Sequence, residues 1–359
     1  MTSESKIVYS QNLCSDVRPL LDGLTPEQIF IITDTGSSKY CLNALLSALP
    51  ELKEARVIVL KEGDENKNLD AVISIWRFLV ENGATRSSLV INLGGGMVTD
   101  LGGFAASTFK RGVRFINIPT TLLSMIDAAT GGKTGFNFKG LKNEIGVINK
   151  ASEVIIYPAY LQTLTKEELL SGYAEMIKHA LLSSENDLME LLSSAPSHIE
   201  PEMWLEIIRK SLQVKENIVA VDPMENGIRK ALNLGHTVGH AFESFSHQNA
   251  MLEGGKPLSH GYAVAFGLAV ELFLSYKHNG LDNRLLSMVN SYIREHYGTY
   301  SIGCDDYESL YALMLHDKKN SAIGAVNFTL LSKPGSPEIN RTLTKEQIFE
   351  ALDYFRDAL

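Results

Sequence analysis

Residues 88–103 read SLVINLGGGMVTDLGG: a short apolar run that ends in three consecutive glycines and continues into a segment with helical spacing. An apolar run of this length is typical of a buried strand, and glycines allow a tight turn into the next helix. The backbone N–H groups of such a turn, together with the positive end of the helix dipole, can bind a phosphate. The strict G-x-G-x-x-G pattern fails at Thr99, and a turn that simply requires glycine explains this stretch equally well by itself.

Four further β-rich runs lie around this stretch, at residues 29–34, 56–60, 114–118 and 153–157. Helical segments such as residues 69–82 separate them, and this alternation predicts a parallel sheet covered on both faces. From about residue 166 to 297 the spacing is mainly helical, followed by a β-like run at 325–331 and a closing helix at 344–358, with Thr344 as its N-cap. We therefore predict an α/β domain with a parallel Rossmann-like sheet at residues 1–162 and a mainly α-helical domain at residues 163–359.

Composition narrows the class of protein. The 359 residues include 33 Lys and Arg against 42 Asp and Glu, a formal charge of −9, which argues against a nucleic-acid or anionic-membrane partner. No apolar run is long enough to span a membrane, and the first residues do not have the pattern of a secretory signal. The three cysteines, Cys14, Cys41 and Cys304, lie too far apart for a CxxC clip, so we expect a reducing cytoplasm.

Histidines gather between residues 236 and 260, where His236, His240, His247 and His260 lie. His236 and His240 have the i, i+4 spacing that places two side chains on one helical face. Thr237 stands where a H-E-x-x-H metalloprotease would have its glutamate. A carboxylate with two histidines is a common catalytic zinc shell, and the helical segment 172–180 offers Glu175, with His179 as a rival ligand. A structural role explains any single histidine better, whereas the clustering of four favours a shared function.

Several cations lie in glycine-rich or weakly charged segments: Lys133, Lys142, Lys178, Lys215, Arg229 and Lys319. In an acidic protein, cations that converge on one site would select an anionic substrate, although each is also explained as a solvated surface group. Asp127 is an acid within an apolar stretch, which is typical of a hydrogen-bonded structural group or of a functional one. The sequence has no Gly-x-Ser-x-Gly elbow and no P-loop lysine.

The motifs taken together resemble the 3-dehydroquinate synthase family of sugar-phosphate cyclases. The matching segments follow the family's order along nearly the whole chain: residues 94–103, 110–115, 119–123, 131–135, 141–146, 163–164, 171–179, 232–241, 260–261 and 317–320. The resemblance implies a cytoplasmic homodimeric lyase of the shikimate pathway, with NAD and zinc or cobalt as cofactors. Its substrate would be 3-deoxy-D-arabino-heptulosonate 7-phosphate, a small sugar-acid phosphate. The product, 3-dehydroquinate, would form by transient oxidation at C5, phosphate β-elimination, re-reduction and aldol closure.

The resemblance also implies roles for individual residues. Glu175, His236 and His260 match the metal ligands. The NAD-binding positions match Asp34, Asp64, Lys67, Gly94, Gly95, Gly96, Met97, Val98, Thr99, Asp100, Thr120, Thr121, Lys133, Lys142, Tyr160 and Thr163. Catalytic roles fall to Lys133, Lys178, His240 and Asp127, and substrate binding to Arg111, Asn143, Lys215, Arg229, Asn233 and Lys319. Arg111 matches an arginine that reaches a phosphate across the dimer interface.

The chain departs from the family pattern at a few positions. Asp64 and Gly36 replace a glutamate and an asparagine on the NAD side, Tyr262 replaces a glutamate, and the loop at residues 246–259 is longer than usual. Three alternatives stay open from the sequence. They are another sugar-phosphate cyclase, of the 2-epi-5-epi-valiolone or 2-deoxy-scyllo-inosose synthase type, a metal-dependent polyol dehydrogenase, and a non-catalytic nucleotide-binding protein.

Overall fold

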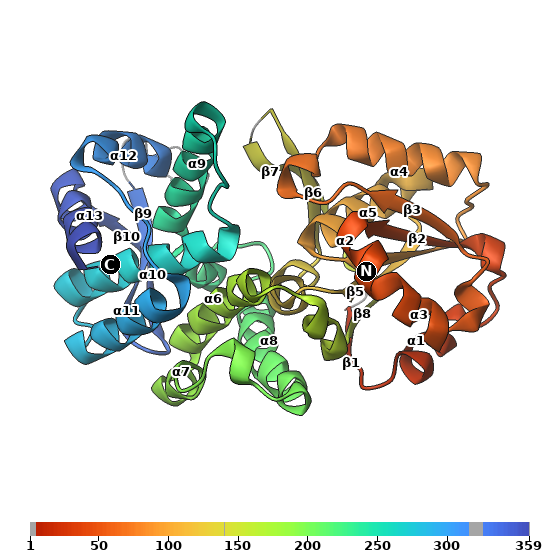
Figure 1. The fold of residues 1–359 in the computed structure, drawn as a ribbon, viewed down its shortest axis with the longest axis horizontal. Helices are drawn as coiled ribbons and strands as arrows, with labels where there is room; N and C mark the ends of the chain where they lie inside the picture. The colour runs from red at the N-terminus through yellow and green to blue at the C-terminus, as the bar shows by residue number, and fades with distance from the viewer. Residues whose placement is uncertain (1–4, 140, 316–325, 359) are drawn as a thin grey trace. The chain divides into compact units, whose positions relative to one another are not determined.

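The computed structural model describes residues 5–139, 141–315 and 326–358. The chain forms two compact units, coloured from red to blue along the chain in Figure 1. The N-terminal unit comprises Met1–Leu169 and Glu200–Arg209, and the C-terminal unit comprises Leu170–Ile199 and Lys210–Leu359. The boundary at residues 162–163 stays a prediction. Within the described part of the chain, no helix has the length and apolar character needed to cross a membrane.

The N-terminal unit is built on a six-stranded sheet in the order β1-β8-β5-β4-β2-β3, and every neighbouring pair is parallel. Its strands are β1 (Lys6–Tyr9), β2 (Ile29–Asp34), β3 (Arg56–Leu60), β4 (Leu89–Gly94), β5 (Arg114–Pro119) and β8 (Glu153–Ile156). All residues of β2 and β4 are buried, as expected for strands covered on both faces. The five predicted runs are confirmed to within a residue, whereas β1 was not predicted.

The same unit contains helices between its strands: α1 (Leu13–Leu21), α2 (Thr35–Ser37), α3 (Asn43–Ala48), α4 (Leu69–Glu81) and α5 (Gly96–Thr108). Helix α4 confirms the predicted helix at 69–82: Asn68 caps it by accepting from the N–H of Ala71 at 3.1 Å. An antiparallel hairpin, β6 (Lys133–Phe138) and β7 (Leu141–Ile148), follows within the same unit. The sequence did not predict this hairpin.

The C-terminal unit is mainly helical. Its helices are α6 (Lys166–Ser183), α7 (Glu185–Leu192), α8 (Trp204–Val221), α9 (His236–Glu253), α10 (His260–Asn279), α11 (Asn283–Tyr297), α12 (Tyr307–Leu315) and α13 (Lys345–Ala358), and its hairpin is β9 (Val326–Lys333) with β10 (Ser336–Leu343). The first residues of α6 and α8 belong to the N-terminal unit. Helix α13 confirms the predicted closing helix. Thr344 caps it, since its hydroxyl accepts from the N–H of Gln347 at 3.4 Å. Strand β9 confirms the β-like run from Val326 onward, and β10 was not predicted.

Helix α10 is the centre of this unit and contacts α9, α11, α13 and β9. Its glycines allow unusually close approaches. A Cβ on Gly267 would lie 2.0 Å from the backbone oxygen of Gly235, at the start of α9. A Cβ on Gly261 would lie 2.0 Å from the backbone oxygen of Ser171 on α6. The missing side chains therefore let α6 and α9 pack directly on α10.

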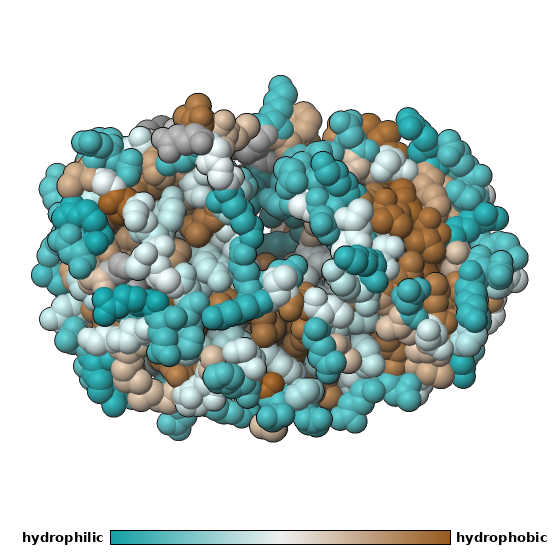
Figure 2. Space-filling model, viewed as in Figure 1, coloured by the Kyte–Doolittle hydropathy of each residue, from teal (hydrophilic) through white to brown (hydrophobic). Residues whose placement is uncertain are grey.

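The surface drawn in Figure 2 mixes hydrophilic residues with separate apolar patches. Apolar side chains exposed in the described residues include Val80 on α4 and Met251 near the end of α9. Exposed apolar residues are ordinary in a soluble globular fold, so neither position by itself indicates a partner.

Candidate metal and nucleotide sites

A carboxylate and two imidazoles meet in the C-terminal unit. Glu175 comes from α6, while His236 and His260 are the first residues of α9 and α10. One ligand atom of each lies within 4.8 Å of the others. Glu175 Oε1 is 3.1 Å from His236 Nε2 and 3.4 Å from His260 Nε2. The structure thus brings together the three residues that the sequence offered as metal ligands.

These separations fit a zinc-type shell. Oxygen and nitrogen donors about 2.0–2.1 Å from a tetrahedral metal lie roughly 3.3 Å from one another. His236 Nδ1 lies 3.1 Å from the backbone oxygen of Leu234. A carbonyl oxygen only accepts, so this contact assigns a hydrogen to Nδ1 and leaves Nε2, which faces Glu175, as the nitrogen that can bind a metal. A divalent cation is the group that this donor set fits best.

Glu175 is fully buried and lies beside a cation. Lys178, on the next turn of α6 and only 2% exposed, forms an ion pair with Glu175 Oε2. Burial alone would raise the pKa of Glu175, but the charge on Lys178 and the contacts with His236 and His260 hold this pKa well below its usual range. Glu175 therefore stays ionised, as a metal ligand must.

His260 carries the opposite shift. Burial lowers its pKa, but the carboxylates of Glu243 and Glu175 outweigh burial and raise the pKa to about 10. The imidazole is therefore protonated at neutral pH in the metal-free protein. A metal that binds here must displace that proton, so metal affinity depends on pH.

A second buried carboxylate supports the backbone of His236. Glu271 on α10 is fully buried, and its two oxygens accept from the N–H groups of Gly235 at 2.7 Å and Val238 at 3.1 Å. Gly235 has a φ of +77°, which favours glycine. The first turn of α9 is thereby capped from α10. Sequence reasoning missed Glu271, although it is the one charged residue in the apolar run 262–275, which is the signal that could have identified it.

Other predicted residues of this unit lie apart from the three donors. The His240 ring is 5.3 Å from the His236 ring and 6.0 Å from the His260 ring, centre to centre. His179, the rival ligand, is buried with its Nδ1 2.8 Å from Ser211 Oγ on α8. Among the described residues, the three-donor group contains neither of these two histidines.

The predicted substrate-binding residues of this unit are buried or partly buried. Lys215 is 7% exposed on α8. Arg229 is 5% exposed and donates from Nη1 to the backbone oxygen of Pro223 at 2.6 Å. Asn233 Nδ2 donates to Glu225 Oε1 at 3.4 Å. Lys319 lies outside the described residues.

The triple-glycine turn is in the N-terminal unit. Strand β4 ends at Gly94, Gly95 is the N-cap and α5 begins at Gly96, so the apolar run, the glycine turn and the helix follow one another as the sequence predicted. A Cβ on Gly95 would lie 3.2 Å from Thr121 Cγ2, and one on Gly96 would lie 3.1 Å from Ala128 Cβ. Glycine at these two positions therefore avoids tight contacts with Thr121 and Ala128, and no side chain covers the backbone N–H groups at the start of α5.

Helix α5 also lies unusually close to its strand. A Cβ on Gly102 would fall 1.9 Å from Asn92 Oδ1 on β4, so glycine is required there for packing. The residues from Gly96 to Asp100, which include the predicted positions Met97, Val98 and Thr99, form the first turns of α5. The positive end of this helix is thus fixed at the carboxyl end of β4, where α/β sheets bind phosphates.

Neighbouring strands end at the same edge. Asp34 ends β2, and its Oδ1 accepts from the Ser37 N–H at 2.7 Å and from the Ser37 hydroxyl at 2.8 Å. Thr120 and Thr121 follow β5. Strand β4 lies between β2 and β5, and the chain order changes direction between β2 and β4, which is the topological position where nucleotides bind.

Lys67 connects three segments of the same unit. It is 4% exposed, and its Nζ lies 2.5 Å from both Asp100 Oδ2 on α5 and Asn143 Oδ1 on β7. Asp64 Oδ2 lies 3.0 Å from Lys142 Nζ. Three short elements hold the remaining predicted positions. Lys133 is the first residue of β6, Asp127 lies in the short π-helix Ser124–Ala128, and Tyr160 and Thr163 lie in the 3₁₀-helix Pro158–Thr163.

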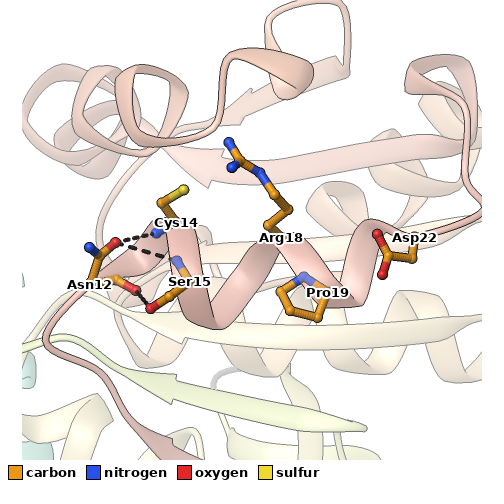
Figure 3. Close-up of a pocket in the computed structure, with 6 residues that line it drawn as sticks. All are labelled: Asn12, Cys14, Ser15, Arg18, Pro19 and Asp22. Atoms are coloured by element: carbon orange, nitrogen blue, oxygen red, sulfur yellow. Dashed lines mark hydrogen bonds between the residues drawn. The ribbon is translucent and has the colours of Figure 1, made fainter.

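Arg111 lies on the surface of the N-terminal unit. Arg111 and Lys110 have φ values of +67° and +49°, and they line a hollow of about 380 Å³ with Thr85 and Arg86. A second hollow, drawn in Figure 3, lies beside α1. There Asn12 caps the helix by accepting from the N–H groups of Cys14 and Ser15, so its carbonyl oxygen serves α1 rather than a ligand.

Comparison with known proteins settles the family. Models of the 3-dehydroquinate synthase N-terminal and C-terminal regions match residues 57–171 and 172–320. A 3-dehydroquinate synthase from Parabacteroides distasonis is 46% identical over 99% of both chains. The chain belongs to the 3-dehydroquinate synthase family. A relative of the same name from Pyrococcus furiosus is 42% identical over 75% of this chain and 77% of its own. The predicted family and enzyme class are confirmed.

Solved structures agree on the fold. The 2-epi-5-epi-valiolone synthase ValA from Streptomyces hygroscopicus, with NAD⁺ and Zn²⁺ bound, has a TM-score of 0.85 and 25% identity over 99% of this chain and 98% of its own. A 2-deoxy-scyllo-inosose synthase complexed with carbaglucose-6-phosphate, NAD⁺ and Co²⁺ has a TM-score of 0.82 and 22% identity over 100% of both chains. The predicted fold class, a Rossmann-like unit with a mainly helical one, is confirmed.

Proposed function

We propose that this chain converts 3-deoxy-D-arabino-heptulosonate 7-phosphate to 3-dehydroquinate and phosphate, the reaction of the family to which it belongs. The observation that carries the proposal is the buried group of Glu175, His236 and His260 with Lys178 against it. This group combines a site for a divalent cation with a fixed positive charge. A substrate with vicinal hydroxyls, a carboxylate and a phosphate suits such a site.

In the C-terminal unit, Glu175, His236 and His260 hold zinc or cobalt. The bound metal supplies a Lewis acid that lowers the cost of removing a proton from a substrate hydroxyl. Lys178 is held in place by its ion pair with Glu175 and presents its charge to an anionic group of the substrate. Lys215, Arg229, Asn233 and Lys319 bind the other polar groups of the substrate. His240, one turn after His236, receives or returns the hydroxyl proton.

In the N-terminal unit, the turn at Gly94–Gly96 and the start of α5 bind the pyrophosphate of NAD. The bound dinucleotide supplies a reversible hydride acceptor, which is regenerated within each turnover. Asp34, Asp64, Thr120, Thr121, Lys142, Tyr160 and Thr163 complete the NAD site. Lys67 orients Asp100 and Asn143, and Asn143 binds the substrate. Lys133 and Asp127 assist proton transfer and stabilise the leaving phosphate.

The enzyme acts as a homodimer in the cytoplasm. Arg111, exposed and held in a left-handed conformation, reaches the partner's substrate phosphate. The three cysteines are all free thiols, which suits a reducing compartment. The acidic composition argues against nucleic acid or an anionic membrane as the ligand, whereas the buried cations Lys178, Lys215 and Arg229 support a small anionic molecule.

The test is a substrate comparison with the NAD- and zinc-loaded protein. Phosphate release is measured with the heptulosonate phosphate, sedoheptulose 7-phosphate and glucose 6-phosphate at equal concentrations. We expect release from the heptulosonate alone, with no net change in NADH absorbance. Preference for either sugar phosphate would instead support another sugar-phosphate cyclase, the second candidate, which the likeness to ValA favours. Accumulation of NADH in step with product would indicate a polyol dehydrogenase.

A further inference from the structure

Glu243 lies directly behind the metal site. It is on α9, seven positions after His236, so two helical turns place both side chains on the same face. Glu243 is only 3% exposed. Its Oε2 lies 3.3 Å from Nδ1 of His260, the first residue of α10. A buried carboxylate of one helix therefore contacts a ligand-bearing residue of the next.

The contact fixes which nitrogen of His260 keeps its hydrogen when the ring is neutral, as it is when a metal binds. An ionised carboxylate oxygen only accepts hydrogen bonds, so Nδ1–H of His260 donates to Glu243. The neutral ring then has its lone pair on Nε2, which lies 3.4 Å from Glu175 Oε1. Nε2 is thus directed to the point where the three donors meet.

Each of the two ligand histidines is oriented by a hydrogen bond from its Nδ1, but the accepting groups differ. His236 uses the backbone oxygen of Leu234, which no substitution removes. His260 uses a side chain, and its own side chain is 30% exposed, against 11% for His236. Packing therefore restrains His260 less than His236, and His260 depends more on its hydrogen bond for a fixed ring orientation.

Charge gives a second, independent argument. Two neutral imidazoles and Glu175 offer a divalent cation a single negative charge, and Lys178 adds a positive charge beside it. Glu243 supplies another negative charge one imidazole away from the cation. A carboxylate is costly to bury, and its place against a ligand imidazole is typical of the carboxylate–histidine–metal arrangement, which makes the ring a stronger donor.

We propose that Glu243 is a positioning residue of the metal centre, which holds His260 in the tautomer and ring orientation that present Nε2 to the cation. The proposal rests on the proposed function, because it requires Glu175, His236 and His260 to bind a metal. Glu243 acts through its contact with His260.

The test measures metal binding without turnover. Dissociation constants for Zn²⁺ and Co²⁺ are determined by chelator competition, in the absence of NAD and substrate, for the wild type, Glu243→Gln and Glu243→Ala. Removal of a group that orients a metal ligand typically lowers metal affinity about 10- to 100-fold, and we expect this loss for Glu243→Ala. Glu243→Gln keeps an oxygen that accepts from Nδ1 but loses the charge, so its loss should be smaller. Ser244→Ala, at the exposed neighbouring position of α9, is the matched control and should bind like the wild type.

Two further readouts separate positioning from stability. The visible absorption band of bound Co²⁺ should shift in both Glu243 variants, since it reports ligand geometry. The melting temperature of the metal-free protein reports folding alone. Wild-type affinity and an unchanged Co²⁺ band in the isosteric Glu243→Gln variant, and in Glu243→Ala where it folds, would overturn the proposal. Failure of the wild type itself to bind either metal would overturn the proposed metal site and this inference with it.

Discussion

The substitution Gly261→Ala tests whether close helix packing builds the metal site. Gly261 is the second residue of α10 and directly follows His260. A Cβ there would lie 2.0 Å from the backbone oxygen of Ser171 and 2.4 Å from its Cα. Both atoms are backbone of α6, one turn before Glu175, so no flexible side chain can move aside.

The size of the disturbance follows from these distances. Ordinary contact begins at 3.4 Å, whereas the added Cβ would lie 2.0 Å from the Ser171 oxygen, so α6 and α10 must move apart locally by about 1.4 Å. Metal–ligand distances tolerate only about 0.2 Å, so a shift of this size between Glu175 and His260 removes one of them from the shell. Overpacking of this kind also costs about 1–3 kcal/mol of folding free energy, or about 2–4 °C in melting temperature per kcal/mol.

The assay pairs metal content after dialysis with thermal unfolding of the metal-free protein. Gly303→Ala in the same unit is the matched control, because its φ is −102° and a Cβ there meets its nearest atoms at 3.6 and 3.9 Å. We expect Gly261→Ala to lose bound zinc and to melt several degrees lower, and Gly303→Ala to match the wild type. A Gly261→Ala protein with full zinc content and an unchanged melting temperature would refute the packing argument.

Three further outcomes are expected. His260→Ala should lose its bound metal, measured by elemental analysis, with an unchanged circular dichroism spectrum; wild-type metal content would show that His260 is not a ligand. Lys178→Met should keep the metal but raise the KM for the phosphorylated substrate by about tenfold or more, because a charge-assisted hydrogen bond is lost; an unchanged KM would remove Lys178 from the substrate site. Brief alkylation at pH 8 should label the exposed Cys304 and spare Cys41, since Cys41 is 2% exposed and burial raises its pKa to about 11. Equal labelling of the two, measured by peptide mass spectrometry, would contradict this reasoning.

The sequence predicted the sheet because its central strands are continuous apolar runs. It missed the strands that lack this signal. Strand β1 has four residues, and β6 begins in a glycine-rich segment. Strand β10, which reads SPEINRTL, contains a proline and has no fully buried residue. Such strands are defined by the partner with which they pair, and the partner is not visible in a local pattern.

The candidate site was predictable only in part. Spacing identified the histidine cluster, but the choice of Glu175 over other carboxylates required the family resemblance. Glu243 and Glu271 were missed, although Glu271 is the one charged residue of an apolar helical segment. Their roles depend on where α9 and α10 cross, and glycines at positions 235, 239 and 267 determine that crossing through contacts between backbones. Periodicity identifies the buried face of a helix but not the residue that this face meets on its neighbour.

The charges of the site explain how it can exist with and without metal. Each of its buried carboxylates has a matching donor: Glu271 has N–H groups at the start of α9, Glu243 has His260, and Glu175 has Lys178 and both imidazoles. In the metal-free protein, the raised pKa of His260, about 10, supplies a proton where the metal would supply its charge. This contribution to stability is complete below the ordinary histidine pKa and is lost as pH rises through 10. When a metal binds, it replaces the proton of His260, and the surrounding carboxylates balance the positive charge in either state. Removal of the metal by a chelator should therefore abolish activity but leave the fold intact. Metal affinity should increase as pH rises, because less of His260 is then protonated.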